Sequence, residues 1–370
     1  MKILQISSAR VQYPGGTERA VLEISKRLSK RHEVTILQTN LYEEDQEFER
    51  LSEIKNLKII TCKNEFFLGG FGYSKDFKEV LKKIYRGFDI IHIHGHGRFT
   101  SDFALRFLNG KKPLIYTAYG FFHTKKHKIM KEAYNLFFKH LKKNFLCTAL
   151  TEIEYNQYRE LKIPKDKIKI LPIGIDFKKL QIKKKHNFFE NKRYLIYVGR
   201  IHKSKGIQHI LKAIEGQNLN LLIVGKDAGY KDEIKRLIKK YQLTDHVKII
   251  ENLNDYEVAQ AFHSSDIAIL FSEWESFGLV VLEAMACGIP IIVSDRGSLP
   301  LIVKNYGHVI KYGDIRRLRE IIKNLMEDPK TRKRVGKEAR EYAKRFDWDN
   351  LIKRYEDIYR GEICENTFSK

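Results

Sequence analysis

Two glutamates, Glu275 and Glu283, are separated by seven residues and enclose the pair Phe277-Gly278. Apolar runs at 267–271 and 289–293 flank them, which predicts a buried strand, a turn, a helix and a second buried strand. A helix that begins near Gly278 would direct its unbonded first amides at phosphate or sugar oxygens. Glu275 would then lie at the mouth of that site, and Glu283 two turns along the helix. The alternative is a solvated acidic pair on an ordinary crossover helix, and the spacing alone favours neither.

A basic loop from Gly199 to Gly206 follows the apolar run 194–198 and contains Arg200 and Lys205. The planar fork of an arginine and the point charge of a lysine could hold a diphosphate from two sides. The order of residues differs from the P-loop pattern G-x-x-x-x-G-K-[ST], which counts against an ATPase or a kinase.

A third polar loop, at Gly15-Gly16, follows the strand pattern of residues 2–7. Two glycines would let the backbone approach a phosphate or a sugar, and Thr17 could cap the next helix, although a flexible turn is the simpler explanation. The dinucleotide pattern G-x-G-x-x-G is absent, so no nicotinamide site is predicted. His94 and His96 follow another strand, and their spacing indicates a metal site only weakly.

Length and composition are those of a soluble globular protein with two domains: 370 residues, 43% hydrophobic and 31% charged. The sequence has no run of eighteen apolar residues and begins with a strand pattern rather than a signal peptide. The four cysteines lack metal-ligand spacing, which is typical of reduced thiols in a cytoplasmic protein.

A net charge of +23 predicts attraction to polyanions. Residues 109–145 hold nine lysines against one acid, Glu132, and residues 121–145 add aromatic side chains at helical spacing. Such a helix could lie on an anionic membrane surface, or it could pack on the core with a solvated lysine face. No zinc-finger, KH or RNP signature is present, so no specific nucleic acid partner is predicted.

Strand and helix patterns alternate in both halves of the chain and restart after the lysine-rich break 178–192, which predicts two doubly wound α/β domains. The division expected from this rhythm is a first domain at 1–175, a linker at 176–192, a second domain at 193–346 and a C-terminal helix at 347–370. Strands are predicted at 2–7, 33–38, 58–61, 89–94, 114–116, 145–150, 194–198, 221–224, 247–250, 267–270 and 289–293.

Three motifs together carry a resemblance to a known family: the loop 198–206, the pair Val224-Gly225 and the block 275–292. With the glycine loop and the C-terminal motif Phe346-Asp347-Trp348, they resemble the retaining glycosyltransferases of family 4 along nearly the whole chain. The resemblance implies a GT-B fold, in which two Rossmann-like domains face each other across a cleft and the C-terminal helix crosses back to the first domain. The first domain would bind the acceptor and the second the nucleotide sugar.

The resemblance also implies a role for each matching residue. Arg200 and Lys205 would bind the diphosphate of a UDP- or GDP-sugar, Glu283 the ribose, and Glu275 the transferred sugar. Enzymes of this family usually need no metal ion or other cofactor, and the leaving phosphate itself accepts the acceptor's proton. The remaining donor-binding positions would be Gly15, Gly16, Gly225, Phe277, Gly278 and Leu279.

Two positions depart from the family pattern. One is the segment 172–176, where the family tends to have Asn before the glycine, and the other affects the predicted active site. The family places a histidine in a T-x-H-G motif, whereas this chain has Thr117-Ala118-Tyr119-Gly120. Tyr119 could bind a sugar hydroxyl in its place, or His123 or His94 could take over the histidine's position.

The expected function is therefore sugar transfer from a nucleotide-diphosphate sugar to a glycan or lipid-linked acceptor, by a cytoplasmic enzyme that can associate with the inner membrane face. Two alternatives remain open. A GT-B nucleotide-sugar epimerase would share the donor site, and a non-catalytic polyanion-binding relative would explain the charge.

Overall fold

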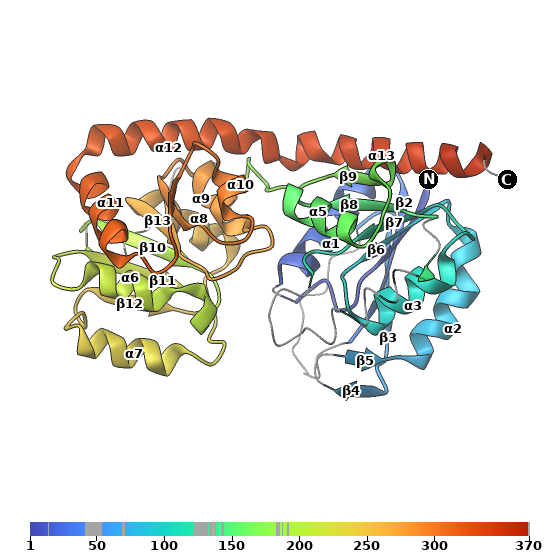
Figure 1. Cartoon of the computed structure of the whole chain (residues 1–370), viewed down its shortest axis with the longest axis horizontal. Helices are drawn as coiled ribbons and strands as arrows, with labels where there is room; N and C mark the ends of the chain where they lie inside the picture. Colours follow the sequence, from blue (N-terminus) through green and yellow to red (C-terminus); the bar gives the residue numbers. More distant parts are fainter. Residues whose placement is uncertain are drawn as a thin grey trace. The chain divides into compact units, whose positions relative to one another are not determined.

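The computed structural model divides the chain into two compact units, Met1–Ile173 with Asp349–Lys370 (unit 1) and Gly174–Trp348 (unit 2) (Figure 1). Each unit is built on its own parallel sheet, of seven strands in unit 1 and six in unit 2, so the predicted pair of α/β domains is confirmed. The structure describes residues 1–13, 15–40, 54–68, 71–121, 144–182, 186, 188–190 and 192–368, together with 132, 136, 138, 140 and 141.

The sheet of unit 1 has the strand order β3-β2-β1-β6-β7-β8-β9. The interior strand β1 is buried on both faces of the sheet, and its apolar residues Ile3, Leu4 and Ile6 are fully buried. A short antiparallel hairpin, β4–β5, follows β3 and was not predicted. The elements are β1 (Lys2–Ile6), α1 (Gly16–Leu28), β2 (Glu33–Thr39), β3 (Leu57–Cys62), β4 (Phe66–Leu68), β5 (Phe71–Tyr73), α2 (Lys75–Ile84), β6 (Ile90–His94), α3 (Phe99–Leu108), β7 (Leu114–Thr117), β8 (Leu146–Ala149), α5 (Glu152–Glu160) and β9 (Ile168–Ile170).

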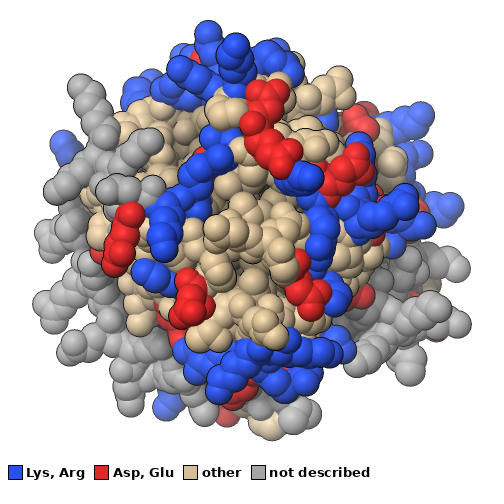
Figure 2. All heavy atoms as spheres, turned by 90° about the vertical axis from the view of Figure 1, so that its left-hand side faces the viewer, with Lys and Arg blue, Asp and Glu red and all other residues tan. Residues whose placement is uncertain are grey.

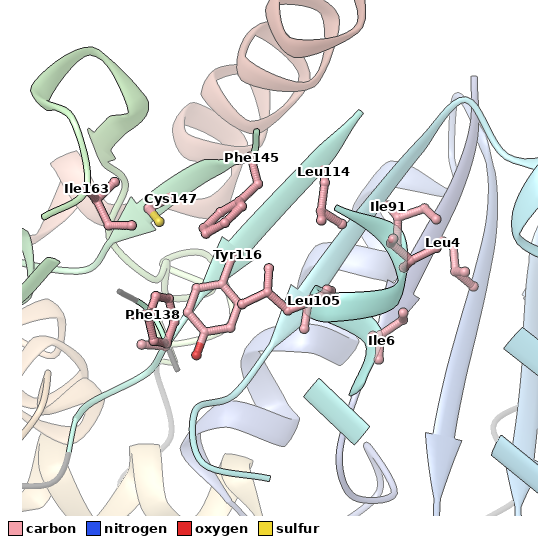
Figure 3. Packing of buried hydrophobic residues seen from close by; sticks show 14 of the residues in the cluster. Leu4, Ile6, Ile91, Leu105, Leu114, Tyr116, Phe138, Phe145, Cys147 and Ile163 are labelled. Atoms are coloured by element: carbon pink, nitrogen blue, oxygen red, sulfur yellow. The ribbon is translucent and has the colours of Figure 1, made fainter. Parts of the chain in front are cut away.

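The core of unit 1 includes two aromatic side chains that the sequence had assigned to a possible membrane surface. Phe138 and Phe145 are fully buried and pack around Tyr116, whose ring centroid lies 6.0 and 6.3 Å from theirs (Figure 3). These two rings therefore belong to the hydrophobic core, which agrees with the second of the two alternatives left open for this segment. Leu136 of the same segment is exposed.

The C-terminal helix α13 (Trp348–Phe368) packs on unit 1, as the predicted fold requires. Its Tyr359 is buried and receives a hydrogen bond of 3.1 Å from the Gln5 side chain in β1. Glu356 pairs with Arg31 at 3.1 Å, and Arg354 donates to the carbonyl of Ile170. Both ends of the chain thus contribute to one core.

The sheet of unit 2 has the strand order β12-β11-β10-β13-β14-β15. The edge strand β15 was not predicted, because three residues are too few for a periodic pattern. The elements are β10 (Tyr194–Val198), η4 (Lys203–Lys205), α6 (Ile207–Ile214), β11 (Asn220–Val224), α7 (Lys231–Lys240), β12 (Val247–Ile250), α8 (Asp255–Ser264), β13 (Ile267–Leu270), α9 (Leu279–Ala286), β14 (Ile291–Ser294), α10 (Leu299–Val303), β15 (His308–Ile310), α11 (Ile315–Glu327) and α12 (Pro329–Ala343).

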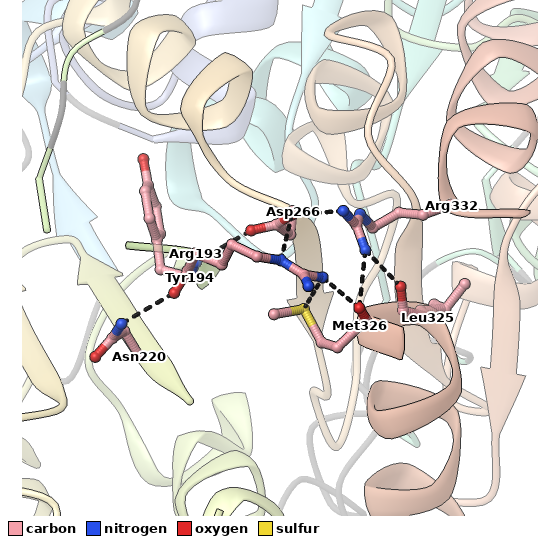
Figure 4. A network of polar contacts seen from close by, with 7 residues as sticks. All are labelled: Arg193, Tyr194, Asn220, Asp266, Leu325, Met326 and Arg332. Carbon is pink, nitrogen blue, oxygen red and sulfur yellow. Dashed lines mark hydrogen bonds and ion pairs between the residues drawn. The ribbon is translucent and has the colours of Figure 1, made fainter. Parts of the chain in front are cut away.

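Some of the basic residues of unit 2 hold the fold together. Asp266, which precedes β13, lies 3.3 Å from the Arg193 guanidinium and 3.0 Å from that of Arg332 (Figure 4). The same two arginines donate to the carbonyl of Met326 at the end of α11, and Arg332 also donates to that of Leu325. Carbonyls in the last turn of a helix lack partners within it, so the two arginines satisfy this helix end.

Charge is segregated along the sequence of unit 2. Residues 311–340 contain eleven Lys and Arg against five Asp and Glu, whereas residues 251–290 contain seven acids and neither Lys nor Arg. Figure 2 shows basic side chains around one face of the molecule, with acidic ones between them. None of the helices in the described part of the chain has the length and apolarity that crossing a bilayer needs.

Candidate functional site

The loops that follow β10 and β11 approach each other closely through two glycines. A Cβ atom on Gly225 would lie 2.0 Å from the carbonyl oxygen of Gly199, so a side chain cannot be accommodated there. Gly225 also has a φ of +147° and Gly199 a φ of +151°, conformations that favour glycine. The loop 199–206 is thereby fixed at the carboxyl ends of the strands, where doubly wound sheets bind ligands.

The other end of this loop is fixed against the residues that follow β13. Gly206 has a φ of +73°, and a Cβ atom there would lie 1.8 Å from the carbonyl oxygen of Phe271. The amide of Glu273 donates a 2.7 Å hydrogen bond to the carbonyl of Ser204. Two loops from distant parts of the sequence are therefore held together by backbone contacts.

This arrangement brings Lys205 and Glu275 into an ion pair. The Lys205 Nζ lies 2.5 Å from the Glu275 Oε1, which also accepts a 3.0 Å hydrogen bond from the Ser272 hydroxyl. Each charged side chain is only 16% exposed, so water screens the pair weakly. The backbone of Glu275 is fixed as well, since its carbonyl accepts from the Ser298 amide and Gly297 packs directly against it.

Tyr197 lies near the Glu275 carboxylate and contacts the backbone of Arg200. The hydroxyl of the buried Tyr197 donates a 2.8 Å hydrogen bond to the carbonyl of Arg200, while the Arg200 side chain is exposed. Burial, and then the negative charge of Glu275, raise the pKa of Tyr197, so this tyrosine stays neutral. The site thus combines a partly buried ion pair with an exposed guanidinium.

Helix α9 begins at the same end of the sheet, directly after Gly278. Gly278 has a φ of +87° and, as a glycine at the N-cap position, has no side chain that could cap the first turn of the helix. Phe277 is 4% exposed and anchors the turn in the core. Glu283 is 6% exposed, which rules out the interpretation of this glutamate as a solvated helix residue. A buried carboxylate at this position is costly unless polar partners surround it.

The glycine loop of unit 1 forms the start of α1. Gly15 is the N-cap residue and Gly16 the first helical residue, so Thr17 lies inside the first turn and the predicted Thr17 cap is wrong. A Cβ atom on Gly15 would lie 2.0 Å from the Glu18 carboxylate. Gly15 therefore leaves room for an acidic side chain at the helix start, where the helix dipole favours negative charge.

His94 and Tyr119 are brought together at the ends of β6 and β7. The Tyr119 hydroxyl lies 2.9 Å from the His94 Nδ1, and the His94 Nε2 lies 2.5 Å from the Gln5 Oε1. The Gln5 amide NH₂ group donates to Tyr359, so its oxygen accepts from the His94 Nε2–H, and His94 Nδ1 accepts from Tyr119. Burial lowers the pKa of His94 to about 3, so the imidazole is neutral.

The neighbouring His92 extends this network. Its Nδ1 lies 2.6 Å from the Tyr359 hydroxyl and its Nε2 lies 2.7 Å from the Thr117 hydroxyl. Burial lowers its pKa as well. His96 instead contacts the Tyr116 hydroxyl at 2.9 Å and packs on Phe121, which is a structural role.

The Tyr119 loop rests on an acidic residue that sequence reasoning missed. Glu154 in α5 is 2% exposed and accepts hydrogen bonds from the amides of Leu150, at 2.8 Å, and Gly120. Burial raises the pKa of Glu154 to about 7. Tyr119 itself has a φ of +58°, a conformation unusual for a side chain of its size. A sequence signal existed only in the position of Glu154 on the apolar face of a short helix.

Two further predicted features receive no structural test. His123 lies outside the described residues, as does most of the basic segment 121–145. Within the described part of the chain, the structure contains no group of three or more His, Cys, Asp or Glu side chains that could hold a metal ion.

The sequence matches two family models that cover consecutive parts of the chain. Residues 14–179 match the model described as Glycosyltransferase Family 4, and residues 178–342 match Glycosyl transferases group 1. An N-acetyl-alpha-D-glucosaminyl L-malate synthase of Bacillus anthracis is 30% identical over 238 residues, which are 61% of this chain and 62% of that protein. An uncharacterized glycosyltransferase of Methanocaldococcus jannaschii is 26% identical over 97% of this chain and 99% of that one.

Solved structures show the same fold at lower identity. A sucrose-phosphate synthase of Thermosynechococcus elongatus superposes with a TM-score of 0.80 at 19% identity and covers 99% of this chain and 100% of that one. Anabaena HepE in complex with UDP superposes with a TM-score of 0.78 at 19% identity over 98% of this chain and 100% of that one. The fold class and the resemblance deduced from the sequence are confirmed: this chain belongs to the glycosyltransferases of family 4, with a group 1 domain as its second half, and has the GT-B fold.

Proposed function

We propose that the chain is a retaining, metal-independent glycosyltransferase that moves a sugar from a UDP- or GDP-sugar to a glycan or lipid-linked acceptor. The observation that carries the proposal is the Lys205–Glu275 ion pair at the carboxyl ends of β10 and β13, beside the start of α9. A cation, a carboxylate and a helix start within one loop system suit a ligand that has both phosphates and hydroxyls.

In this proposal, Arg200 and Lys205 bind the donor diphosphate, and Glu283 accepts hydrogen bonds from the ribose hydroxyls. Glu275 then exchanges its partner: Lys205 moves to the phosphate, and the carboxylate accepts from hydroxyls of the transferred sugar. The related fold of HepE was solved with UDP and with UDP-glucose, which supports a uridine nucleotide as the first donor to test. Within unit 2, the backbone of the donor site would be supplied by Gly225, Phe277, Gly278 and Leu279.

The proposed transfer breaks the bond between the anomeric carbon and the diphosphate oxygen and forms a bond from the same face of the sugar to the acceptor oxygen. The proton of the acceptor hydroxyl passes to the leaving phosphate oxygen. Positive charge from Arg200 and Lys205 stabilises the leaving diphosphate as its charge develops. Neutral His94 orients the Tyr119 hydroxyl, whose loop would line the acceptor side.

The acceptor would be a glycan or a lipid-linked glycan at the inner membrane face. The support for the membrane is the lysine content of residues 121–145, although two of the segment's aromatic rings, Phe138 and Phe145, are buried. Sedimentation with liposomes tests this part separately: binding to vesicles that contain phosphatidylglycerol and not to neutral vesicles supports it, and equal indifference to both removes it.

A thermal-shift screen with UDP-, GDP-, ADP- and dTDP-sugars would identify the donor, because a ligand of the folded state raises the melting midpoint. Lys205→Ala should abolish the shift, whereas Lys203→Ala, an exposed lysine of the same loop, should keep it. Nucleotide release with acceptor glycans in the presence of EDTA, and NMR of the product's anomeric proton, then test transfer, metal independence and retention. An altered free nucleotide sugar without any acceptor would instead identify an epimerase.

A further inference from the structure

Unit 1 contains a cavity of about 460 Å³ that none of the proposed donor residues lines. It lies between the hairpin β4–β5 and helix α3, and β5 contacts α3. The side chains of its described lining are mostly aromatic, with one carboxylate and one guanidinium among them: Phe66, Tyr73, Phe99, Phe103, Asp102 and Arg106.

The aromatic walls of the cavity have a fixed geometry. The ring centroids of Tyr73 and Phe99 lie 4.8 Å apart, and the rings of Phe99 and Phe103 stack at 6.0 Å with 16° between their planes. The Lys78 ammonium lies 4.6 Å from the Tyr73 ring centroid and 3.2 Å from its hydroxyl, so it holds the tyrosine in place. Tyr73, Phe99 and Phe103 therefore form one contiguous aromatic wall, since each ring packs against the next.

Two of these rings are unusually accessible. Phe66 is 59% exposed and Tyr73 is 38% exposed. Single exposed apolar side chains are common on proteins, but here they gather around one cavity that also contains charged groups. Such a combination is typical of a ligand site rather than of an incompletely buried core.

The position of the cavity in the fold points to the substrate side of unit 1. The hairpin follows the carboxyl end of β3, and α3 follows the carboxyl end of β6. The Tyr119 loop follows β7 at the same edge of the sheet, since all these strands are parallel. Ligands of doubly wound sheets bind at this edge.

We propose that this cavity binds a pyranose ring of the acceptor glycan, an inference that rests on the proposed glycosyltransferase function. A pyranose has an apolar C–H face that can lie on Phe66 or Tyr73, and hydroxyl groups that can donate to Asp102 and accept from Arg106. An acyl chain in the same place would exclude water and supply no polar group to Asp102 or Arg106, whereas a sugar supplies hydroxyls. The chemistry of the lining therefore favours a sugar over an acyl chain.

Saturation-transfer NMR on the full chain tests the proposal without any donor. The probes are the methyl pyranosides of glucose, galactose, mannose and N-acetylglucosamine, and n-octyl glucoside as the amphiphile. The variants are Phe66→Ala, an exposed position with little effect on folding, and Arg106→Gln. The matched control is Phe107→Ala, because Phe107 stacks on Phe103 at 5.7 Å in the same helix but lies outside the described lining of the cavity.

We expect saturation of the ring protons of at least one methyl pyranoside. Its dissociation constant should be about tenfold higher for Phe66→Ala, because this variant loses one aromatic ring on which the sugar stacks. Arg106→Gln should weaken binding as well, and Phe107→Ala should not. Binding of no pyranoside, equal binding by Phe66→Ala, or saturation confined to the octyl chain would each overturn the proposal. UDP-sugar binding by Lys205→Ala is measured on the same samples, so that a failure of the proposed donor site is recognised separately.

Discussion

Replacing Lys205 by methionine and Glu275 by glutamine, singly and together, should reveal a coupling energy of about 1–3 kcal/mol in the unfolding of unit 2. The value follows from the geometry, since the charged atoms are 2.5 Å apart and each side chain is 16% exposed. Ion pairs in full contact with water couple by less than about 1 kcal/mol, because solvent screens them and the side chains remain mobile.

The two single variants should differ. In Lys205→Met, the Glu275 carboxylate keeps its hydrogen bond from the Ser272 hydroxyl but loses the lysine ammonium. The negative charge of Glu275 then stays largely buried without its counter-ion. Glu275→Gln keeps an oxygen that can accept from both Ser272 and Lys205. We therefore expect Lys205→Met to be the more destabilising of the two changes.

Tryptophan emission during urea unfolding supplies the measurement. The chain has two tryptophans, Trp274 and Trp348, and both belong to unit 2, so the signal reports on the unit that contains the pair. Saturating UDP should reduce the coupling, because the diphosphate replaces Glu275 as the partner of the ammonium. A coupling below about 0.5 kcal/mol, or one that UDP leaves unchanged, would refute the reasoning.

Three further predictions address the backbone, the donor and pH. Gly206→Ala should lower the free energy of unfolding of unit 2 by at least about 2 kcal/mol more than the control Gly216→Ala, measured in urea. Both glycines have a φ near +70°, but only a Cβ atom at position 206 would meet a backbone oxygen, at 1.8 Å. Glu283→Gln should raise the dissociation constant for UDP, measured by calorimetry, by about ten- to a hundredfold. This change corresponds to the loss of hydrogen bonds to a charged group, which are worth about 1.5–3 kcal/mol. Glu154 has its pKa raised from 4.5 to about 7 by burial, so its contribution to the stability of unit 1 is present at low pH and is lost as the pH rises to about 7. Hydrogen exchange of unit 1 should show this loss, and Glu154→Gln should remove that part of the pH dependence; an unchanged profile would contradict the assignment.

The two sheets were predictable because strands buried on both faces are continuous apolar runs, as Ile3, Leu4 and Ile6 show. The short strands were not predictable, since β4, β5, β9 and β15 have three residues each. The start of α1 was placed too late because Thr17 is a strong cap residue, whereas the chain uses Gly15, which leaves room for the Glu18 side chain.

In the candidate site, the sequence identified the residue types but could not identify their partners. Lys205 and Glu275 are seventy positions apart, and their contact depends on the close backbone approach at Gly206. The same limit applies to His94 and Tyr119, which β6 and β7 bring together. Local patterns do not encode such distances, because they arise only when strands that are remote in the sequence pair in one sheet.

The hydrogen bonds of Tyr359 determine the order in which the polypeptide can reach its final structure as it is synthesised. Gln5 and His92 precede unit 2 in the sequence, whereas their partner hydroxyl lies in α13, which follows unit 2. Unit 2 is contiguous from Gly174 to Trp348 and can fold before translation ends. The sheet that is made first is therefore completed last, and a chain that stopped before residue 359 would leave buried polar groups of its N-terminal sheet without their partner.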